Sequence, residues 1–218
     1  MVNYYDKAIT ESCRQSLFVL QDHKFIQDFY LAGGTALALQ IGHRISTDLD
    51  WFSSTNHLQT LAREHIQDVL ELSGKFEIIS EQDGLLFARF NETDTSFTYQ
   101  HHPLLEHTFN YQGVNLASPI DIGLMKLAAI TSRGTRRDFV DIYCLREIIS
   151  LEELFKLAPK KYSDRPQFLA VVVRALVYFD DAEQQPMPKM LNRVDWKDIR
   201  IYCEDAARSL TRRLSGLS

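Results

Sequence analysis

The strongest structural signal in this chain is residues 31–52, LAGGTALALQIGHRISTDLDWF. Its glycine pair, Gly33-Gly34, follows a short apolar segment and opens a segment that predicts a helix, which Gly42 closes. Further along, Asp48 and Asp50 stand at positions i and i+2 inside an apolar run. A glycine turn at a helix start is a phosphate-type site, and paired carboxylates are a cation-type site. Together they suggest a metal-dependent enzyme that acts on a nucleotide.

The acidic pair supports the metal-binding part of this interpretation. On a strand, Asp48 and Asp50 share one face, with roughly 6.6 Å between them along the backbone. Their carboxylates can converge on one Mg²⁺ or bracket two metal ions about 3.5–4 Å apart. The alternative is an exposed acidic pair at a turn, the commoner setting of Asp-x-Asp. Leu49 and Trp51 favour a strand that is buried on one face, where two carboxylates without a cation would repel each other.

The residues that precede the acidic pair support the phosphate-binding part. Gly33-Gly34 lets the backbone N–H groups of a helix start approach an anion, and Thr35, near the helix cap, adds a hydroxyl. The alternative is a plain strand-to-helix turn. Arg44 either holds a substrate phosphate or forms a structural salt bridge to one of the aspartates. Ser46 fits a cap or a turn.

A second charged cluster lies in the C-terminal half. Lys126 and Arg133 are seven residues apart and share a helix face, and Asp138 and Asp141 share a face of the next helix. Lys126 stands among apolar residues, where an ammonium group needs an anionic partner. The two faces either flank one substrate or form a salt-bridged helical hairpin, and the residues alone favour the hairpin.

Bulk composition excludes several classes. The chain has 218 residues, 45% hydrophobic and 24% charged, with a net charge of −5, so no global basic field holds nucleic acid. Cys13, Cys144 and Cys203 are too scattered for a disulfide framework or a structural zinc site. No apolar run approaches the roughly 18 residues of a membrane span, and the N-terminus does not resemble a signal peptide. We therefore expect a cytoplasmic protein without a membrane partner.

The pattern along the chain predicts an α+β fold: a small mixed or antiparallel sheet with flanking helices in residues 1–117, followed by a helical bundle in residues 118–218. Strands are expected at 29–32, 49–52, 76–79, 85–90 and 96–99, and a further one through 109–114. Helices are expected at 6–28 (one or two), 35–40, 57–73, 119–132, 136–149, 151–158, 165–178 and 195–213.

Two groups of motifs in this chain resemble those of a known family. Gly33-Gly34-Thr35-Ala36-Leu37, followed by the segment 44–52 (RISTDLDWF), resembles the core signature of the polymerase-β-like nucleotidyltransferases. Within these it resembles the AbiEii/AbiGii toxin family of abortive-infection and toxin–antitoxin systems. The later segments 126–133 (KLAAITSR) and 137–141 (RDFVD) resemble later motifs of that family in the expected order. The resemblance runs from about residue 28 to about residue 148.

The resemblance implies a Mg²⁺-dependent transfer of a nucleotidyl group from a nucleoside triphosphate to an acceptor, RNA such as transfer RNA or a protein. It also implies a neighbouring antitoxin and a nucleotidyltransferase core with a C-terminal helical unit that completes the cleft. Asp48 and Asp50 would bind Mg²⁺, and Asp138 would act as a general base. The implied nucleotide-binding residues are Gly33, Gly34, Thr35, Arg44, Ser46, Lys126 and Arg133, with Lys126 on the phosphates.

One departure from the pattern concerns a third acid. Many nucleotidyltransferases carry a further carboxylate on a later strand, but the matching segment 96–103 (SFTYQHHP) has none. Glu92 and Asp94 precede it and are expected in a loop. Either Asp48 and Asp50 suffice with help from Asp138, or the chain is a weakened, nucleotide-binding module on the same fold. A metal-dependent phosphohydrolase is a third possibility.

Overall fold

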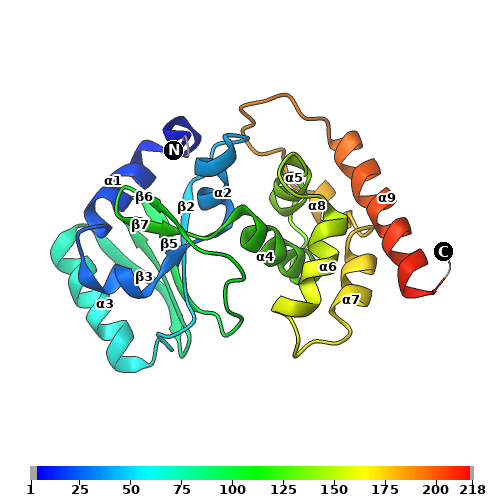
Figure 1. The fold of residues 1–218 in the computed structure, drawn as a ribbon. Coiled ribbons are helices and arrows are strands. Elements are labelled where there is room, and N and C mark those ends of the chain that lie inside the picture. Colours follow the sequence, from blue (N-terminus) through cyan, green and yellow to red (C-terminus); the bar gives the residue numbers. More distant parts are fainter. Residues whose placement is uncertain (1–3, 217–218) are drawn as a thin grey trace. The chain divides into compact units, whose positions relative to one another are not determined.

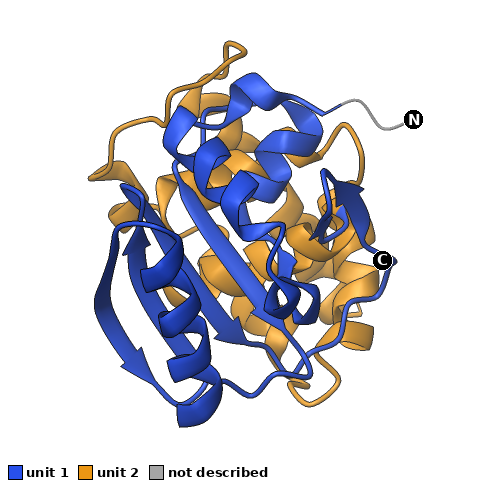
Figure 2. Ribbon diagram, turned by 90° about the vertical axis from the view of Figure 1, so that its left-hand side faces the viewer, with its two compact units in different colours: residues 1–118 blue, residues 119–218 orange. Residues whose placement is uncertain are grey.

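The computed structural model describes residues 4–216 and divides into two compact units, residues 1–118 and 119–218 (Figure 2). We call them the sheet unit and the helical unit. The predicted α+β class, with a mixed sheet followed by helices, is confirmed. Among the described residues, no helix is both long enough and apolar enough to cross a membrane.

The sheet unit is built on one seven-stranded sheet of order β3-β4-β5-β2-β1-β7-β6 (Figure 1). Strand β2 runs parallel to β5 and β1 parallel to β7, while the other neighbours are antiparallel. The sheet is therefore mixed, with β2 near its centre. The strands are β1 (Tyr30–Leu31), β2 (Asp48–Ser53), β3 (Phe76–Gln82), β4 (Leu85–Phe90), β5 (Thr93–Tyr99), β6 (Phe109–Tyr111) and β7 (Val114–Leu116).

The central strands bury one face and leave the other half-exposed. Along β2 the burial alternates, with Leu49 and Trp51 inside and both aspartates on the opposite face. Trp51 stacks on Phe97 of β5, which also contacts Phe25. Period-two burial thus orients the aspartates away from this core. Helix α1 (Glu11–Leu20) packs on β5, α3 (Thr60–Ser73) packs on β3, and the 3₁₀ turn η2 (Lys24–Asp28) packs on β7. A second 3₁₀ turn, η1 (Asp6–Ala8), packs on α2 (Gly33–Ile41).

Two tight hairpins set the register of β3, β4 and β5. Asp83-Gly84, a residue pair typical of two-residue hairpin turns, joins β3 to β4. Asn91-Glu92 joins β4 to β5, with φ of 46° and 65°. This second turn needs positive φ at two residues that are not glycine, so it carries no glycine signal. The expectation that β5 starts at residue 96 and that Asp94 lies in a loop is therefore wrong, because β5 begins at Thr93.

Helix α2 (Gly33–Ile41) starts earlier than predicted. Its N-cap is Ala32, so both glycines belong to the first turn and Thr35 is not a cap residue. Gly42 ends the helix in the left-handed conformation, as expected. The helix therefore presents the Gly33-Gly34 backbone at its N-terminus.

The helical unit follows the predicted order, and its helices differ from the predicted bounds at some ends. Helix α4 has its predicted bounds. The helix predicted at 136–149 ends at residue 145, and the one predicted at 165–178 spans only residues 168–175. The short helix at residues 180–183 was not predicted. Lys161 and Asp121 form an ion pair of 2.8 Å with both side chains fully buried, which joins α6 to α4. The helices are α4 (Pro119–Ser132), α5 (Arg136–Leu145), α6 (Leu151–Lys161), α7 (Phe168–Ala175), α8 (Asp180–Glu183) and α9 (Trp196–Leu214).

Candidate nucleotide and metal site

Strand pairing brings the glycine turn to the acidic pair. Strands β1 and β2 are antiparallel, with Leu31 opposite Trp51. The Ala32 N–H then donates to the Asp50 carbonyl oxygen at 2.9 Å. Gly33 follows directly, so the start of α2 lies beside Asp50. Two segments that are seventeen residues apart in sequence form one site through this register.

Gly33 is required at its position for two reasons. Its φ is +63°, which disfavours side chains, and an added Cβ would overlap the Asp50 carboxylate at Oδ2. The glycine therefore makes room for the Asp50 carboxylate against the helix N-terminus. A plain turn glycine would have open space here, as Gly216 has.

Hydrogen bonds orient both carboxylates. Ser96 Oγ on β5 donates to Asp50 Oδ1 at 2.9 Å. Thr47 Oγ1 donates to Asp48 Oδ1 at 2.7 Å. Both aspartates are half-buried on the same face of β2. Their oxygens are thus held in place and still reachable from solvent.

Asp94 adds a third carboxylate to this face. It pairs in register with Asp48 across the parallel strands β2 and β5, as Ser96 pairs with Asp50. In-register neighbours project to the same side of a sheet. The Asp94 carboxylate accepts a 2.8 Å hydrogen bond from Arg89 Nε, and these side chains are 37% and 51% exposed. The acid that the sequence assigned to a loop therefore lies on the strand that neighbours the pair.

A buried guanidinium group underlies the first turn of α2. Arg44 is 2% exposed, and its Nη1 donates to the Ile45 carbonyl oxygen at 3.2 Å and to Ser46 Oγ at 3.4 Å. A Cβ on Gly34 would overlap Arg44 Nη2 and come within 3.2 Å of Ser46 Oγ. The second glycine is thus needed because the guanidinium group approaches the backbone closely. Positive charge and free helix N–H groups are concentrated at one place.

Thr35 is buried between the helix and the strand. Its hydroxyl donates to the main-chain oxygen of Asp48, and the residue is 1% exposed. As placed, this side chain ties α2 to the start of β2.

In the helical unit, Lys126 is enclosed by two aspartates. Its Nζ lies 2.9 Å from Asp138 Oδ1 and 2.6 Å from Asp141 Oδ2. Lys126 is 5% exposed and both aspartates are fully buried. The predicted faces of α4 and α5 do meet, and they meet as the salt-bridged helical hairpin that the residues alone favoured.

Arg133 and Thr135 complete this cluster. Arg133 holds Asp138 with Nε at 3.1 Å and Nη2 at 3.2 Å, and Thr135 Oγ1 donates to Asp138 at 2.6 Å. Burial pushes the pKa of Asp138 up, but Lys126 and Arg133 outweigh it and lower that pKa to about 2. This lowered pKa and these donors keep Asp138 ionised near neutral pH, with its oxygens engaged by Lys126, Arg133 and Thr135.

Three residues with positioning contacts escaped the sequence analysis. Ser96 and Asp94 were missed because the strand that carries them starts after a turn without glycine. Thr135 was missed because it stands before a helix, where threonine usually caps the backbone. The fixed two-residue spacing of Asp94 and Ser96, which matches that of the acidic pair, was the signal that could have found the first two.

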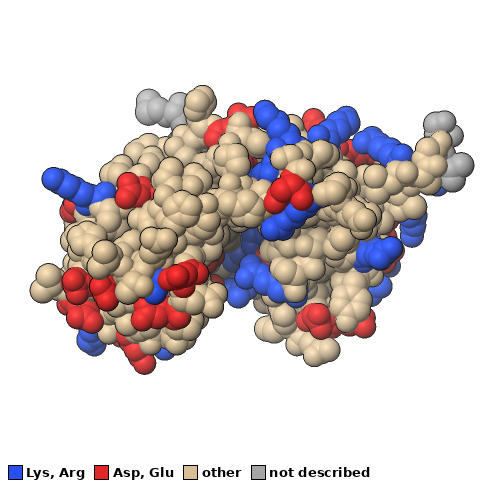
Figure 3. Space-filling view, turned by 90° about the horizontal axis from the view of Figure 1, so that it is seen from below, with Lys and Arg blue, Asp and Glu red and all other residues tan. Residues whose placement is uncertain are grey.

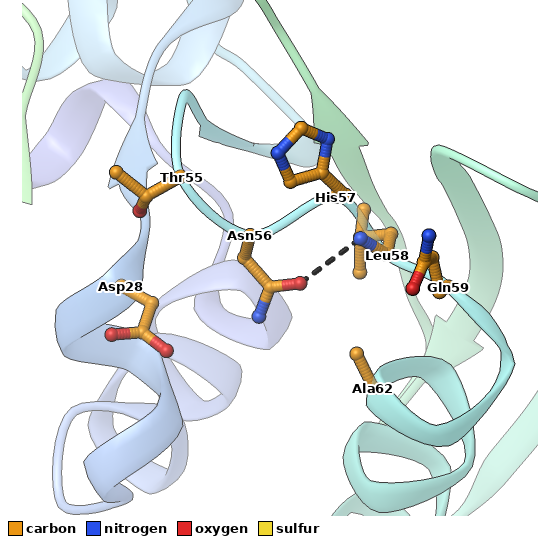
Figure 4. A pocket seen from close by; sticks show the side chains of 7 residues that line it. All are labelled: Asp28, Thr55, Asn56, His57, Leu58, Gln59 and Ala62. Carbon is orange, nitrogen blue, oxygen red and sulfur yellow. Dashed lines mark hydrogen bonds between the residues drawn. The ribbon is translucent and has the colours of Figure 1, made fainter.

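The sheet unit has a further hollow, but its chemistry differs. A cavity of about 460 Å³ lies along residues 55–59, after the end of β2, with Asp28 on its wall (Figure 4). Roughly 16 Å of strand separates it from Asp48. None of the seven described residues that line it is Lys or Arg. This cavity therefore does not suit a phosphate.

The donor set around Asp50 fits a hard divalent cation. Carboxylate oxygens are the ligands that Mg²⁺ prefers, and Asp48, Asp50 and Asp94 share one half-exposed face. The gap that a Cβ at Gly33 would fill keeps the Asp50 carboxylate at the helix start. The arrangement can therefore hold a cation next to an anion-binding helix N-terminus.

The known proteins that this chain resembles include nucleotidyltransferases. The family described as Nucleotidyl transferase AbiEii toxin, Type IV TA system, matches residues 15–212. An uncharacterized protein of Aquifex aeolicus (strain VF5) is 33% identical over 219 residues, covering 95% of this chain and 97% of that protein.

Two solved structures share the fold. MenT4, a nucleotidyltransferase toxin from Mycobacterium tuberculosis H37Rv, superposes with a TM-score of 0.59 at 17% identity, covering 92% of this chain and 82% of that chain. A putative nucleotidyltransferase from H. pylori gives a TM-score of 0.50 at 15% identity and covers 95% of both chains.

Proposed function

Because the chain belongs to the AbiEii nucleotidyl transferase toxin family, we propose that it transfers a nucleotidyl group from a nucleoside triphosphate to an RNA acceptor with the help of Mg²⁺. In such a transfer, an acceptor hydroxyl oxygen bonds to the α-phosphorus and its proton passes to solvent. The bond from the α-phosphorus to the bridging oxygen breaks, and pyrophosphate leaves. The observation that carries the proposal is the contact of the Gly33-Gly34 helix start with the Asp50 carboxylate.

Asp48 and Asp50 would hold the cation, and Asp94, which shares their face through strand register, would become a third ligand only by moving toward them. Bound there, Mg²⁺ would neutralise phosphate charge and activate the acceptor hydroxyl. The protein's own contribution is orientation, because Ser96 and Thr47 fix the two carboxylates. For Asp94 to take part, its carboxylate must exchange Arg89 for the cation, and both side chains are exposed enough to move.

The N-terminus of α2 would hold the triphosphate. Its free N–H groups and its dipole favour an anion, and the Arg44 guanidinium group adds a full positive charge beneath them. Arg44 and Ser46 would act mainly from below the backbone, because both are buried. Thr35 would support the site through its bond to Asp48.

In the helical unit, Arg133 is the cluster member best suited to a phosphate, since its side chain is 61% exposed. Lys126 is enclosed by Asp138 and Asp141, so a role on the phosphates requires that it leave one of them. We propose that the two aspartates position Lys126 and Arg133. The toxin family also implies a cognate antitoxin, which would be the protein partner.

The test is label transfer from each nucleoside triphosphate. The protein is incubated with Mg²⁺, total cellular RNA and one triphosphate labelled at the α-phosphate, and in parallel with the same triphosphate labelled at the γ-phosphate. The proposal predicts α-label on RNA and γ-label in pyrophosphate. Label on protein alone would replace RNA by a protein acceptor.

A weakened, nucleotide-binding module is the second candidate, and the Arg89–Asp94 pair is the observation that favours it. It predicts nucleotide binding without transfer of either label. Release of γ-label as inorganic phosphate, with nothing on an acceptor, would instead indicate a phosphohydrolase.

A further inference from the structure

Charge is distributed unevenly between the two units. Residues 1–118 hold 7 Lys and Arg against 15 Asp and Glu, a formal charge of −8, whereas residues 119–218 hold 17 against 14, a charge of +3. Figure 3 shows this on one face, with red prevailing on the sheet unit and blue on the helical unit. A polyanion is therefore attracted by the helical unit, although the chain as a whole is acidic.

The helical unit has a cavity of about 360 Å³ beside the end of α4 and along α7. This volume lies in the range of small-ligand pockets. Its walls combine two arginines, Arg133 and Arg174, with an aromatic ring, Tyr178, and a carboxylate, Asp181. The proposed function already gives Arg133 a phosphate-binding role, whereas Arg174, Tyr178 and Asp181 have no role in it.

The two arginines suit a phosphate. Arg133 is anchored by Asp138 through Nε and Nη2, which fixes the plane of its guanidinium group while most of the side chain stays exposed. Arg174 is exposed, and within residues 4–216 its side chain has no ion-pair or hydrogen-bond partner. An oriented guanidinium group and an unpaired one at the same cavity form a phosphate clamp.

The remaining wall suits a base. The Tyr178 side chain is 54% exposed and Val171 is 45% exposed, so the cavity offers an aromatic ring and an aliphatic surface to a flat ligand. Asp181 can accept from a base amino group or a ribose hydroxyl and would repel the carboxylates of an acidic peptide. Aromatic stacking with phosphate contacts is how proteins bind unpaired nucleotides.

We propose that this cavity binds one unpaired nucleotide of the RNA acceptor. Arg133 and Arg174 contact its phosphate, Tyr178 stacks on its base, and Asp181 accepts a hydrogen bond from the base or the ribose. The proposal rests on the proposed function for the identity of this RNA as the acceptor. Binding of a single strand by the cavity is measurable without any transfer.

The experiment measures binding of a fluorescent ten-nucleotide single-stranded RNA of mixed sequence to the full chain at two salt concentrations. The variants are Arg174→Glu, Tyr178→Ala and Tyr178→Phe. Arg193→Glu is the control, because it makes the same charge change at an exposed loop arginine outside the cavity. Thermal unfolding checks that each variant folds.

We expect Arg174→Glu and Tyr178→Ala to weaken RNA binding about tenfold or more. Tyr178→Phe, which keeps the ring, and Arg193→Glu should stay within about threefold of the wild type. Binding of nucleoside triphosphate should not change in any variant, while transfer to RNA should fall in parallel with RNA binding. Equal losses of RNA affinity in Arg174→Glu and Arg193→Glu would show that the cavity is not the RNA site and that only the overall charge matters.

The two proposals fail in different ways. Transfer to RNA that survives Arg174→Glu and Tyr178→Ala would overturn the cavity and leave the proposed function standing. RNA binding that depends on the cavity, without any transfer, would support the cavity as an RNA site and contradict the proposed function. If poly-glutamate displaced the RNA as readily as unlabelled RNA does, the proposal of a nucleotide ligand would be wrong. The result would indicate an acidic peptide as the ligand.

Discussion

Ser96 Oγ on β5 donates a 2.9 Å hydrogen bond to Asp50 Oδ1 on the neighbouring parallel strand. The two residues are in-register partners, so the bond follows from the strand pairing itself. The carboxylate is held from one side by this hydroxyl, and its other oxygen lies against Gly33. Such outer contacts orient a metal ligand before the metal arrives.

Ser96→Ala should therefore raise the Mg²⁺ concentration needed for half-maximal transfer by about tenfold to a hundredfold, the usual effect of losing such a contact. Thr98→Ala is the matched control, because Thr98 lies two residues further along the same face of β5. The measurement is a Mg²⁺ titration of label transfer for both variants. Equal Mg²⁺ requirements in the two variants would contradict the role of Ser96.

Gly33→Ala should abolish transfer and destabilise the fold. The new Cβ meets Asp50 Oδ2, and the residue must also keep a φ of +63°. The positive φ alone costs about 1–2 kcal/mol, and the displaced carboxylate removes activity. Transfer rates and urea unfolding measure the two effects separately.

Gly84→Ala separates these causes. Gly84 has a φ of +83°, but its Cβ would make only an ordinary contact of 3.8 Å with Tyr99. It should show a similar loss of stability and keep wild-type transfer below its unfolding temperature. Loss of transfer in this variant as well would mean that backbone strain alone explains the glycine at position 33.

The buried cluster around Asp138 should make the free energy of unfolding depend on pH in the acid range. The folded-state pKa of Asp138 is about 2, below its ordinary value of 3.8, because Lys126 and Arg133 outweigh the cost of burial. A depressed pKa contributes stability above the unfolded value, and that contribution is lost as pH falls through the folded value. The free energy of unfolding should therefore drop between about pH 4 and pH 2.

Asp138→Asn tests this dependence. The variant should be less stable at pH 7, because Lys126 loses one of its two buried carboxylates, and should show a shallower decline between pH 4 and pH 2. The measurement is chemical unfolding across that pH range. Parallel pH profiles for variant and wild type would contradict the assignment.

Ionisation of Asp138 should also leave no inflection in the transfer rate between pH 5 and pH 9.

Much of the fold follows from local signals. The helix predicted at 119–132 has its observed bounds, because Ser-Pro-x-Asp at 118–121 is a strong helix-start pattern. Gly42 and Gly74 mark the observed ends of α2 and α3. The alternation in β2 predicted the face on which both aspartates lie. These signals are short-range, because capping, left-handed glycines and period-two burial act within a few residues.

The rest depends on pairing between distant segments. Asp94 became part of the site because Asn91-Glu92 forms a two-residue turn that lacks glycine and starts β5 early. Ser96 and Gly33 contact Asp50 through strand register, which one sequence does not encode locally. The buried state of Arg44 has the same origin, since the first turn of α2 packs on it.

Asp48 and Asp50 should be indispensable for nucleotidyl transfer, because both would hold the metal. The most direct measurement compares the rate of α-label transfer by the wild type with that of Asp48→Asn and Asp50→Asn at saturating Mg²⁺. Asp68→Asn, at a residue of α3, is the control, and thermal unfolding confirms that all four proteins fold. We predict a loss of at least about a hundredfold in both site variants and none in the control. Wild-type transfer rates in Asp48→Asn and Asp50→Asn would contradict the role of these carboxylates as metal ligands for transfer.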